Sequence, residues 1–153
     1  MVKIRAWQPS DVPQIVQLVA AILEKEFPQD QAAYPPQDLT RLEEAYRPPE
    51  STFLVAEEAG RIVGTCGVKA EDGKTAILRR LFVGPFHRGQ GVGLDLLKEA
   101  LAFCRRRGFQ EAIIRTSTSM KGAIRLCKSL GFEEDGRWTL GGVTLIRFRL
   151  RLT

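Results

Sequence analysis

The alternation of apolar and polar positions changes period several times along this chain, and each change predicts a new element. Near the N-terminus, apolar residues first alternate with polar ones, as in a strand, and then recur at helical spacing. Ser10 or Asp11 is expected to cap that first helix. A proline-rich segment over 27–49 is expected to be irregular. The elements predicted for this part are a strand over 2–7, a helix ending near Glu26 and a short helix over 38–46.

Three strands are predicted in the middle of the chain. Apolar runs with strand character cover about 52–58, 61–70 and 75–83. The turns between them carry Ala59-Gly60 and Asp72-Gly73, and such pairs are typical of tight hairpins. We therefore expect these strands to form an antiparallel meander.

The remaining pattern predicts a helix, a strand, a second helix and a final hairpin. Gly131 is expected to cap the second helix, and Gly141-Gly142 to form the turn of the hairpin. Because a strand–helix–strand crossover returns the chain to the same sheet, the strands on either side of the first of these helices should be parallel. The predicted ranges are a helix over 91–107, a strand over 111–116, a helix over 119–130 and strands over 132–140 and 143–152.

A glycine-rich loop joins the third strand of the meander to its helix. Gly84-Pro85 ends the strand, and Gly89, Gly91 and Gly93 precede the apolar positions of the helix. Without a Cβ atom, glycine lets the backbone turn sharply and approach a ligand. The unpaired N–H groups of a first helical turn favour negative charge, as does the helix dipole. The loop therefore has the properties of a phosphate-binding loop, although glycines at such a turn also permit tight packing.

The spacing of these glycines excludes two common phosphate-binding loops. A P-loop needs Lys-Ser or Lys-Thr after its glycines, and neither follows here. A dinucleotide fingerprint needs Gly-x-Gly-x-x-Gly after the first strand of its unit, whereas these glycines are evenly spaced and lie past mid-chain. The remaining pattern, Arg88-Gly-Gln-Gly-Val-Gly93, resembles the acyl-coenzyme A loop of the GCN5-related N-acetyltransferase (GNAT) superfamily.

Other segments carry the same resemblance over nearly the whole chain. The segment 123–132 resembles the family's helix that closes in Leu-Gly-Phe, 53–64 its central hairpin, and 4–11 its opening strand and helix entrance. The resemblance implies the fold class, a mixed α/β fold whose mainly antiparallel central sheet of about seven strands has helices on both faces. At 153 residues, the chain has room for a single N-acetyltransferase domain over 1–153.

The resemblance also implies acetyl-coenzyme A as co-substrate, with direct transfer of its acetyl group to an amine. The central parallel strands are expected to part, with the pantetheine arm in the gap. Backbone groups of Leu81 and Val83 would bind the pantetheine amides, and N–H groups over 88–93 the pyrophosphate. The Arg88 side chain would contact either a phosphate or a surface carboxylate. The expected cofactor-binding residues are Leu81, Phe82, Val83, Arg88, Gly89, Gln90, Gly91, Val92, Gly93 and Leu94.

The residues for proton handling depart from the family pattern. Cys127 stands where the resemblance implies a tyrosine that protonates the leaving sulfur. It is either a general acid, since an unperturbed thiol has a pKa of about 8.5, or a packing residue on an apolar helix face. Ile77 stands where many relatives carry a glutamate base, and Met120 where an asparagine often contacts the cofactor. The alternatives for the base are Glu26, Asp30, Tyr34 and Glu57.

The net charge and the cysteines bear on three questions: nucleic-acid binding, the redox state of the thiols and metal binding. The net charge of +5 would suit a nucleic-acid-binding surface, but the basic residues are dispersed and no recognition motif is present, so no nucleic-acid partner is expected. The densest basic run, 105–107, is expected to complement a helix C-terminus. The three cysteines are far apart in apolar contexts, which predicts reduced thiols. No metal-ligand spacing is present, and no metal is expected.

Two functional hypotheses remain. The leading one is an N-acetyltransferase that moves an acetyl group from acetyl-coenzyme A to a primary amine of a small molecule, peptide or lysine. The alternative is a coenzyme A-binding regulatory module with little or no turnover, motivated by the two departures in proton handling. No apolar run is long enough to span a membrane and no signal peptide is evident, so a cytoplasmic protein without a membrane partner is expected.

The last predicted strand raises two further possibilities. Its arginines, Arg147, Arg149 and Arg151, alternate with apolar residues and face either an anionic substrate or solvent. The same strand over 143–152 offers an edge at which a homodimer can pair.

Overall fold

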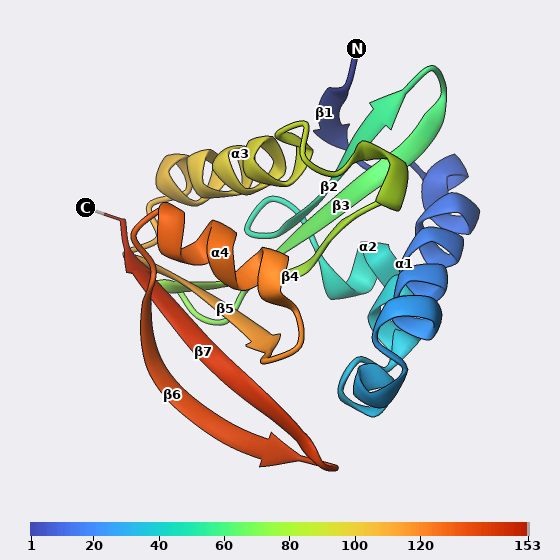
Figure 1. Cartoon of the computed structure of the whole chain (residues 1–153). Helices are drawn as coiled ribbons and strands as arrows, with labels where there is room; N and C mark the ends of the chain where they lie inside the picture. The colour runs from blue at the N-terminus through green and yellow to red at the C-terminus, as the bar shows by residue number, and fades with distance from the viewer. Residues whose placement is uncertain (153) are drawn as a thin grey trace.

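A seven-stranded sheet with helices on both faces organises the chain in the computed structural model, which describes residues 1–152 (Figure 1). The strand order is β1-β2-β3-β4-β5-β7-β6, and only β4 and β5 pair in parallel. The strands are β1 (Lys3–Ala6), β2 (Thr52–Glu58), β3 (Arg61–Ala70), β4 (Thr75–Val83), β5 (Glu111–Ser117), β6 (Glu133–Leu140) and β7 (Val143–Arg151). The α-helices are α1 (Val12–Glu26), α2 (Leu42–Ala45), α3 (Val92–Arg106) and α4 (Lys121–Ser129).

The predicted fold class and the predicted meander are confirmed. Strands β2, β3 and β4 have the predicted bounds and are antiparallel, and β4 is parallel to β5 as the crossover through α3 requires. The two hairpin turns of the meander and the final hairpin lie where the glycine pairs predicted them. None of the helices within residues 1–152 is long and apolar enough to cross a membrane.

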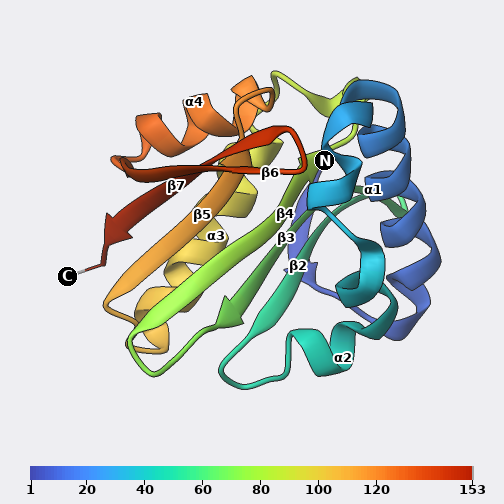
Figure 2. The same cartoon turned by 90° about the horizontal axis from the view of Figure 1, so that it is seen from below.

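Two expectations about the fold are wrong. The proline-rich segment is not irregular, because it forms 3₁₀ turns over Pro28–Ala33 and Pro36–Arg41 before α2. Proline begins both turns, where its missing N–H leaves no hydrogen bond unmade. The last strand is not an edge, because β7 lies between β5 and β6 (Figure 2). The edge on this side of the sheet is β6, so any pairing with a second copy would have to use that strand.

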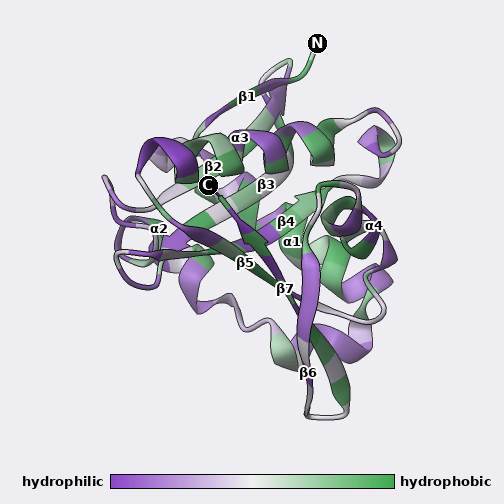
Figure 3. Ribbon diagram, turned by 90° about the vertical axis from the view of Figure 1, so that its left-hand side faces the viewer, coloured by the Kyte–Doolittle hydropathy of each residue, from purple (hydrophilic) through white to green (hydrophobic). Residues whose placement is uncertain are grey.

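The two faces of the sheet carry separate hydrophobic clusters. One cluster lies under α3 and α4 and includes Leu96, Leu97 and Phe148. The other lies under α1 and α2 and includes Ile15 and Phe53. Polar and apolar residues alternate along α3, as the coloured bands in Figure 3 show, because this helix turns one side to the sheet and the other to solvent. Each cluster fixes its helices against the central strands.

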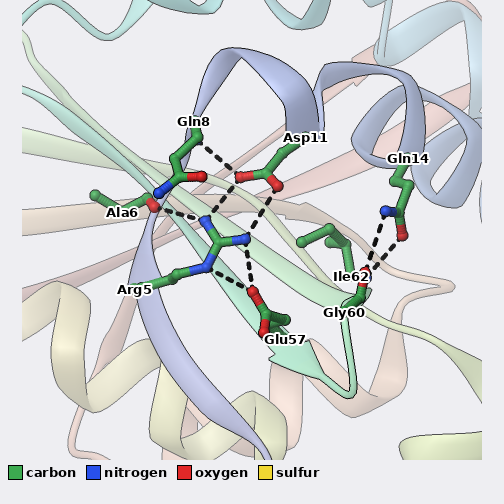
Figure 4. Close-up of polar contacts among 8 residues, drawn as sticks. All are labelled: Arg5, Ala6, Gln8, Asp11, Gln14, Glu57, Gly60 and Ile62. Atoms are coloured by element: carbon green, nitrogen blue, oxygen red, sulfur yellow. Dashed lines mark hydrogen bonds and ion pairs between the residues drawn. The ribbon is translucent and has the colours of Figure 1, made fainter.

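An ion-pair network joins the first strand to the entrance of α1 (Figure 4). The Arg5 guanidinium donates to both carboxylate oxygens of Asp11, at 2.8 and 3.0 Å, and to Glu57 of β2 at 2.9 Å. Asp11 also accepts the Gln8 N–H at 2.8 Å and so closes the turn before α1. Glu57, one of the alternatives for the base, is therefore part of a structural network at the β1 side of the sheet.

Candidate functional site

The parallel strands β4 and β5 separate halfway along their length. Their pairing runs from Thr75 opposite Glu111 to Leu78 opposite Ile114, and it stops there. The rest of β4 pairs with β3 alone. A gap thus opens in the sheet beside residues 79–83, as the resemblance implied.

A bulge at Arg80 marks this separation. Arg80 has φ of 58°, and the β3–β4 register shifts between Thr65 and Gly67. The Thr65 hydroxyl donates to the Arg80 carbonyl at 2.7 Å. Such a bulge bends a strand and re-aims its side chains. The Arg80 side chain consequently turns to Asp38, whose carboxylate it contacts at 2.6 and 3.1 Å.

The glycine loop places a row of free N–H groups at the start of α3. Gly89 and Gly91 have φ of 75° and 85°, a left-handed conformation in which a side chain is disfavoured, and Gly91 is the N-cap. Within residues 1–152, the N–H groups of residues 88–94 donate to no other backbone or side-chain group. Because these groups lie at the positive end of the helix dipole, they favour an anion there.

A cavity of about 610 Å³, the first cavity, lies between this loop, the unpaired end of β4 and α4. Gly93 packs against α4 so closely that a Cβ atom would lie 3.0 Å from Leu126 Cδ1. Of the ten predicted cofactor-binding residues, only Gln90 is outside the lining, and its side chain donates to the Phe86 carbonyl at 3.3 Å. The lining includes Leu81, Phe82, Val83, Arg88, Gly89, Gly91, Val92, Gly93 and Leu94, together with Met120 and Arg125.

The Arg88 side chain bridges two segments at the rim of the first cavity. Its guanidinium donates to both oxygens of Glu26, at 2.5 and 2.8 Å, and to the Val83 carbonyl at 3.0 Å. Arg88 thus pairs with a carboxylate at this rim, and its contact with a phosphate stays a prediction. Glu26, another alternative for the base, is held at this rim by Arg88.

Cys127 lies in the core. Its side chain is fully buried in the cluster under α3 and α4, and it lines neither this cavity nor the second cavity described below. Its neighbour Leu126 takes the cavity position. Burial raises the pKa of the Cys127 thiol to about 12. The structure thus agrees with the packing interpretation, and it does not bring the thiol to the cavity where a leaving sulfur would be.

A second cavity, of about 380 Å³, lies farther back along β4. Ile77, at the position of the missing glutamate, lines it. Tyr34 is the only one of the four alternatives for the base that lines it, and its hydroxyl accepts the Ser117 N–H at 3.2 Å. Asp30 is buried and accepts hydrogen bonds from the hydroxyls of Ser117, which is also buried, and of Ser119. The full lining is Ala33, Tyr34, Lys69, Ala70, Glu71, Ile77, Leu78, Arg79, Arg80, Arg115 and Leu145.

The arrangement can hold an anionic group at the glycine loop and an extended chain in the sheet gap. Open backbone groups at the gap can hydrogen-bond amides or polarise a carbonyl, and preorganised N–H donors stabilise a developing oxyanion. Within the described residues, no group of three or more His, Cys, Asp or Glu side chains could hold a metal ion. The backbone groups of the loop and the gap can thus bind and orient an anionic ligand with an extended arm.

Solved structures that resemble this fold include acetyltransferases. The protein has a TM-score of 0.88 to an acetyltransferase of the GNAT family from Staphylococcus aureus Mu50, at 21% identity over 100% of both chains. It has a TM-score of 0.81 to a putative acetyltransferase from Salmonella typhimurium described with its cofactor acetyl-CoA, at 22% identity over 99% of this chain and 94% of that one. At such identities the likeness establishes the fold.

The sequence establishes the family. The sequence model of the Acetyltransferase (GNAT) family matches residues 16–132, and the chain belongs to this family. N-acetyltransferase 8F1 of Rattus norvegicus is 30% identical over 123 residues, which are 73% of this chain and 56% of that protein. N-acetyltransferase 8 of Rattus norvegicus is 37% identical over 91 residues, 56% of this chain and 41% of that protein. The chain spans about half the length of the curated relatives it matches.

Proposed function

We propose that the protein is an N-acetyltransferase that moves an acetyl group from acetyl-coenzyme A to a primary amine. The observation that carries this proposal is the first cavity, because it joins the free N–H groups of residues 88–94 to the opening between β4 and β5. The glycine loop would bind the pyrophosphate, and the backbone of Leu81 and Val83 the pantetheine arm. The thioester would then lie in the gap.

The reaction needs no covalent intermediate with the enzyme. The amine nitrogen bonds to the acetyl carbon, the carbon–sulfur bond breaks, and the coenzyme A thiolate leaves. The proton lost by the amine balances the proton that the thiolate takes up. Holding two reactants in contact accounts for much of the rate in such transfers. Backbone N–H groups at the gap would stabilise the oxyanion of the tetrahedral intermediate.

Calorimetry with acetyl-coenzyme A, followed by an assay of free thiol release with a panel of primary amines, tests this proposal. We expect binding in the micromolar range and amine-dependent thiol release. Failure to bind acetyl-coenzyme A would contradict the assignment of the cavity. Binding without release by any amine would support the coenzyme A-binding regulatory module instead.

Cys127→Ala tests whether proton transfer involves the buried thiol. We expect the pH dependence of thiol release to be the same as in the wild type, because Cys127 is outside both cavities. The free energy of unfolding should fall by about 1 kcal/mol, since a buried side chain is shortened. Loss of the high-pH part of the rate profile would restore the general-acid role. Urea unfolding of the same variant separates a stability defect from a catalytic one.

A further inference from the structure

The second cavity lies on the face of the sheet that α1 and α2 cover. Gly67 packs on this face, since a Cβ atom there would lie 2.6 Å from the Tyr46 ring. Arg79 pairs with Gly67, and residues paired across two strands share a face. Residues 77–80 of β4 line this cavity, whereas residues 81–83 line the first cavity. The two cavities therefore follow one another along β4.

Cationic side chains outnumber carboxylates in the lining of the second cavity. Lys69, Arg79, Arg80 and Arg115 line it, against the single carboxylate of Glu71. In the part of the chain that the structure describes, no ion pair holds three of these cations, since Arg80 alone pairs with a carboxylate. The three other cations face one carboxylate, so the cavity carries an excess of positive charge that favours a negatively charged occupant.

Two of these arginines are placed where the strands part. The last β4–β5 pair is Leu78 opposite Ile114, so Arg79 and Arg115 are the first residues beyond it on each strand. Ile77 and Ile113 are also paired, and Arg79 and Arg115 follow them by two residues, which puts all four on one face. The two arginines therefore stand on neighbouring strands at the inner end of the gap, and both line the second cavity.

Arg80 gives a second, independent sign of an occupant with acceptor oxygens. Its side chain is only 2% exposed, and two of its nitrogens bind Asp38 and the Pro35 carbonyl. The third, Nη1, is buried and has no hydrogen-bond partner among the described residues. A buried donor without an acceptor costs free energy that an acceptor-bearing ligand or its water would recover. Apolar residues such as Ile77 and Leu145 also line the cavity.

We propose that the second cavity binds the acceptor through a carboxylate, so that the substrate is a primary amine of the α-amino-acid type with an apolar side chain. This inference rests on the proposed acetyl transfer. The planar guanidinium group of arginine matches a carboxylate in geometry and in charge. A carboxylate held by Arg79 and Arg115 places an amine one carbon away at the opening between the strands. Polyamines lack the carboxylate and are repelled by the cations.

Matched pairs of acceptors test the proposal. L-leucine and L-phenylalanine are compared with their neutral amides, L-leucinamide and L-phenylalaninamide, with spermidine as a cationic probe. Calorimetry with the protein saturated with coenzyme A measures binding without turnover, and thiol release from acetyl-coenzyme A measures transfer. We expect the acids to bind at least tenfold more tightly than the amides. The amides have the more acidic ammonium groups, so amine reactivity alone would favour them in the transfer assay.

The variants Arg79→Gln and Arg115→Gln identify the groups responsible. Each should raise the KM for the acid about tenfold or more, while the KM for acetyl-coenzyme A and the binding of the amide stay as in the wild type. Arg106→Gln, on the exposed side of α3 and outside both cavities, is the control. Equal binding of acid and amide, no binding of either, preferred use of spermidine, or unchanged acid affinity in both variants would overturn the proposal.

The binding measurement and the thiol-release assay together distinguish a failure of this proposal from a failure of the proposed function. Arginine-dependent binding of the acids without thiol release would leave the carboxylate site in place and contradict acetyl transfer to them. Thiol release with the amides but not with the acids would support acetyl transfer and reject the carboxylate site.

Discussion

Gly91→Val is expected to weaken the binding of acetyl-coenzyme A by roughly 10- to 100-fold, which corresponds to about 1.4 to 2.8 kcal/mol. Gly91 has φ of 85°, where a β-branched side chain is strained, so the loop would change conformation and turn its N–H groups away. In the present conformation a Cβ atom there meets no protein atom within 4 Å, because it points into open space beside the first cavity. Calorimetry with acetyl-coenzyme A measures the loss.

Gly108→Val is the matched control at the other end of α3. Gly108 has φ of 81°, and a Cβ atom there also meets nothing within 4 Å, but this glycine lies outside the first cavity. Both variants should lower the free energy of unfolding to a similar extent, since both force valine into a left-handed position. Only Gly91→Val should lose affinity. Unchanged affinity in folded Gly91→Val, or equal losses in both variants, would contradict the assignment of the glycine loop.

Local signals explain how well the sequence predicted the meander and the glycine loop. Hairpin turns such as Ala59-Gly60 need left-handed backbone, and in the structure these two residues have φ of 51° and 81°. The loop residues Gly89 and Gly91 likewise adopt the conformation that only glycine adopts readily. In both places a few adjacent residues determine the local backbone, so their types alone carry the information.

Features that depend on distant residues were not predictable in this way. The 3₁₀ turns over 28–33 and 36–41 have no apolar period of their own, and they are held by contacts such as that of Asp38 with Arg80. Tertiary contacts likewise determine the order of β6 and β7, because either strand of a hairpin can pair with β5. The secondary-structure propensities of residues and the hydrophobic period along the sequence describe neither kind of contact.

The two cavities of the candidate site differ in the same way, because local sequence largely predicts the first and does not predict the second. One continuous segment, residues 81–94, supplies more than half of the lining of the first cavity, and nine of the ten residues predicted for it line it. The second cavity joins β3, β4, β5, β7 and the turn before Tyr34, which are far apart in the sequence. The available signal was the pair Arg79-Arg80 inside an otherwise apolar strand. The arginine stripe of β7 is the more regular pattern in the sequence, but Arg147 and Arg149 lie near the carboxylates of Asp135 and Glu111 and line neither cavity.

Asp38→Asn is expected to lower the free energy of unfolding by about 3 to 5 kcal/mol, because it leaves a buried guanidinium without its counter-charge. The side chains of Arg80 and Asp38 are 2% and 8% exposed, and the Tyr46 hydroxyl donates to the same carboxylate at 2.6 Å. Urea unfolding measures the change. Glu134→Gln, which removes the carboxylate of an exposed pair with Arg137, is the control and should leave stability nearly unchanged.

A double variant and a pH series show whether charge is the cause. Asp38→Leu combined with Arg80→Met should be more stable than Asp38→Asn, since no unpaired buried charge remains.

Burial alone would raise the pKa of the Asp38 carboxyl, but hydrogen bonds from Arg80 and Tyr46 outweigh it and hold the pKa below its usual value. The ionic contribution is therefore fully present above the unfolded-state pKa, near 3.8, and is lost as the pH falls through the lower folded-state pKa. The stability difference between the wild type and Asp38→Asn should accordingly be constant near neutral pH and shrink in acid below that value. A difference that stayed constant through this acid range would show that the lost stability comes from packing and not from the charge of Asp38.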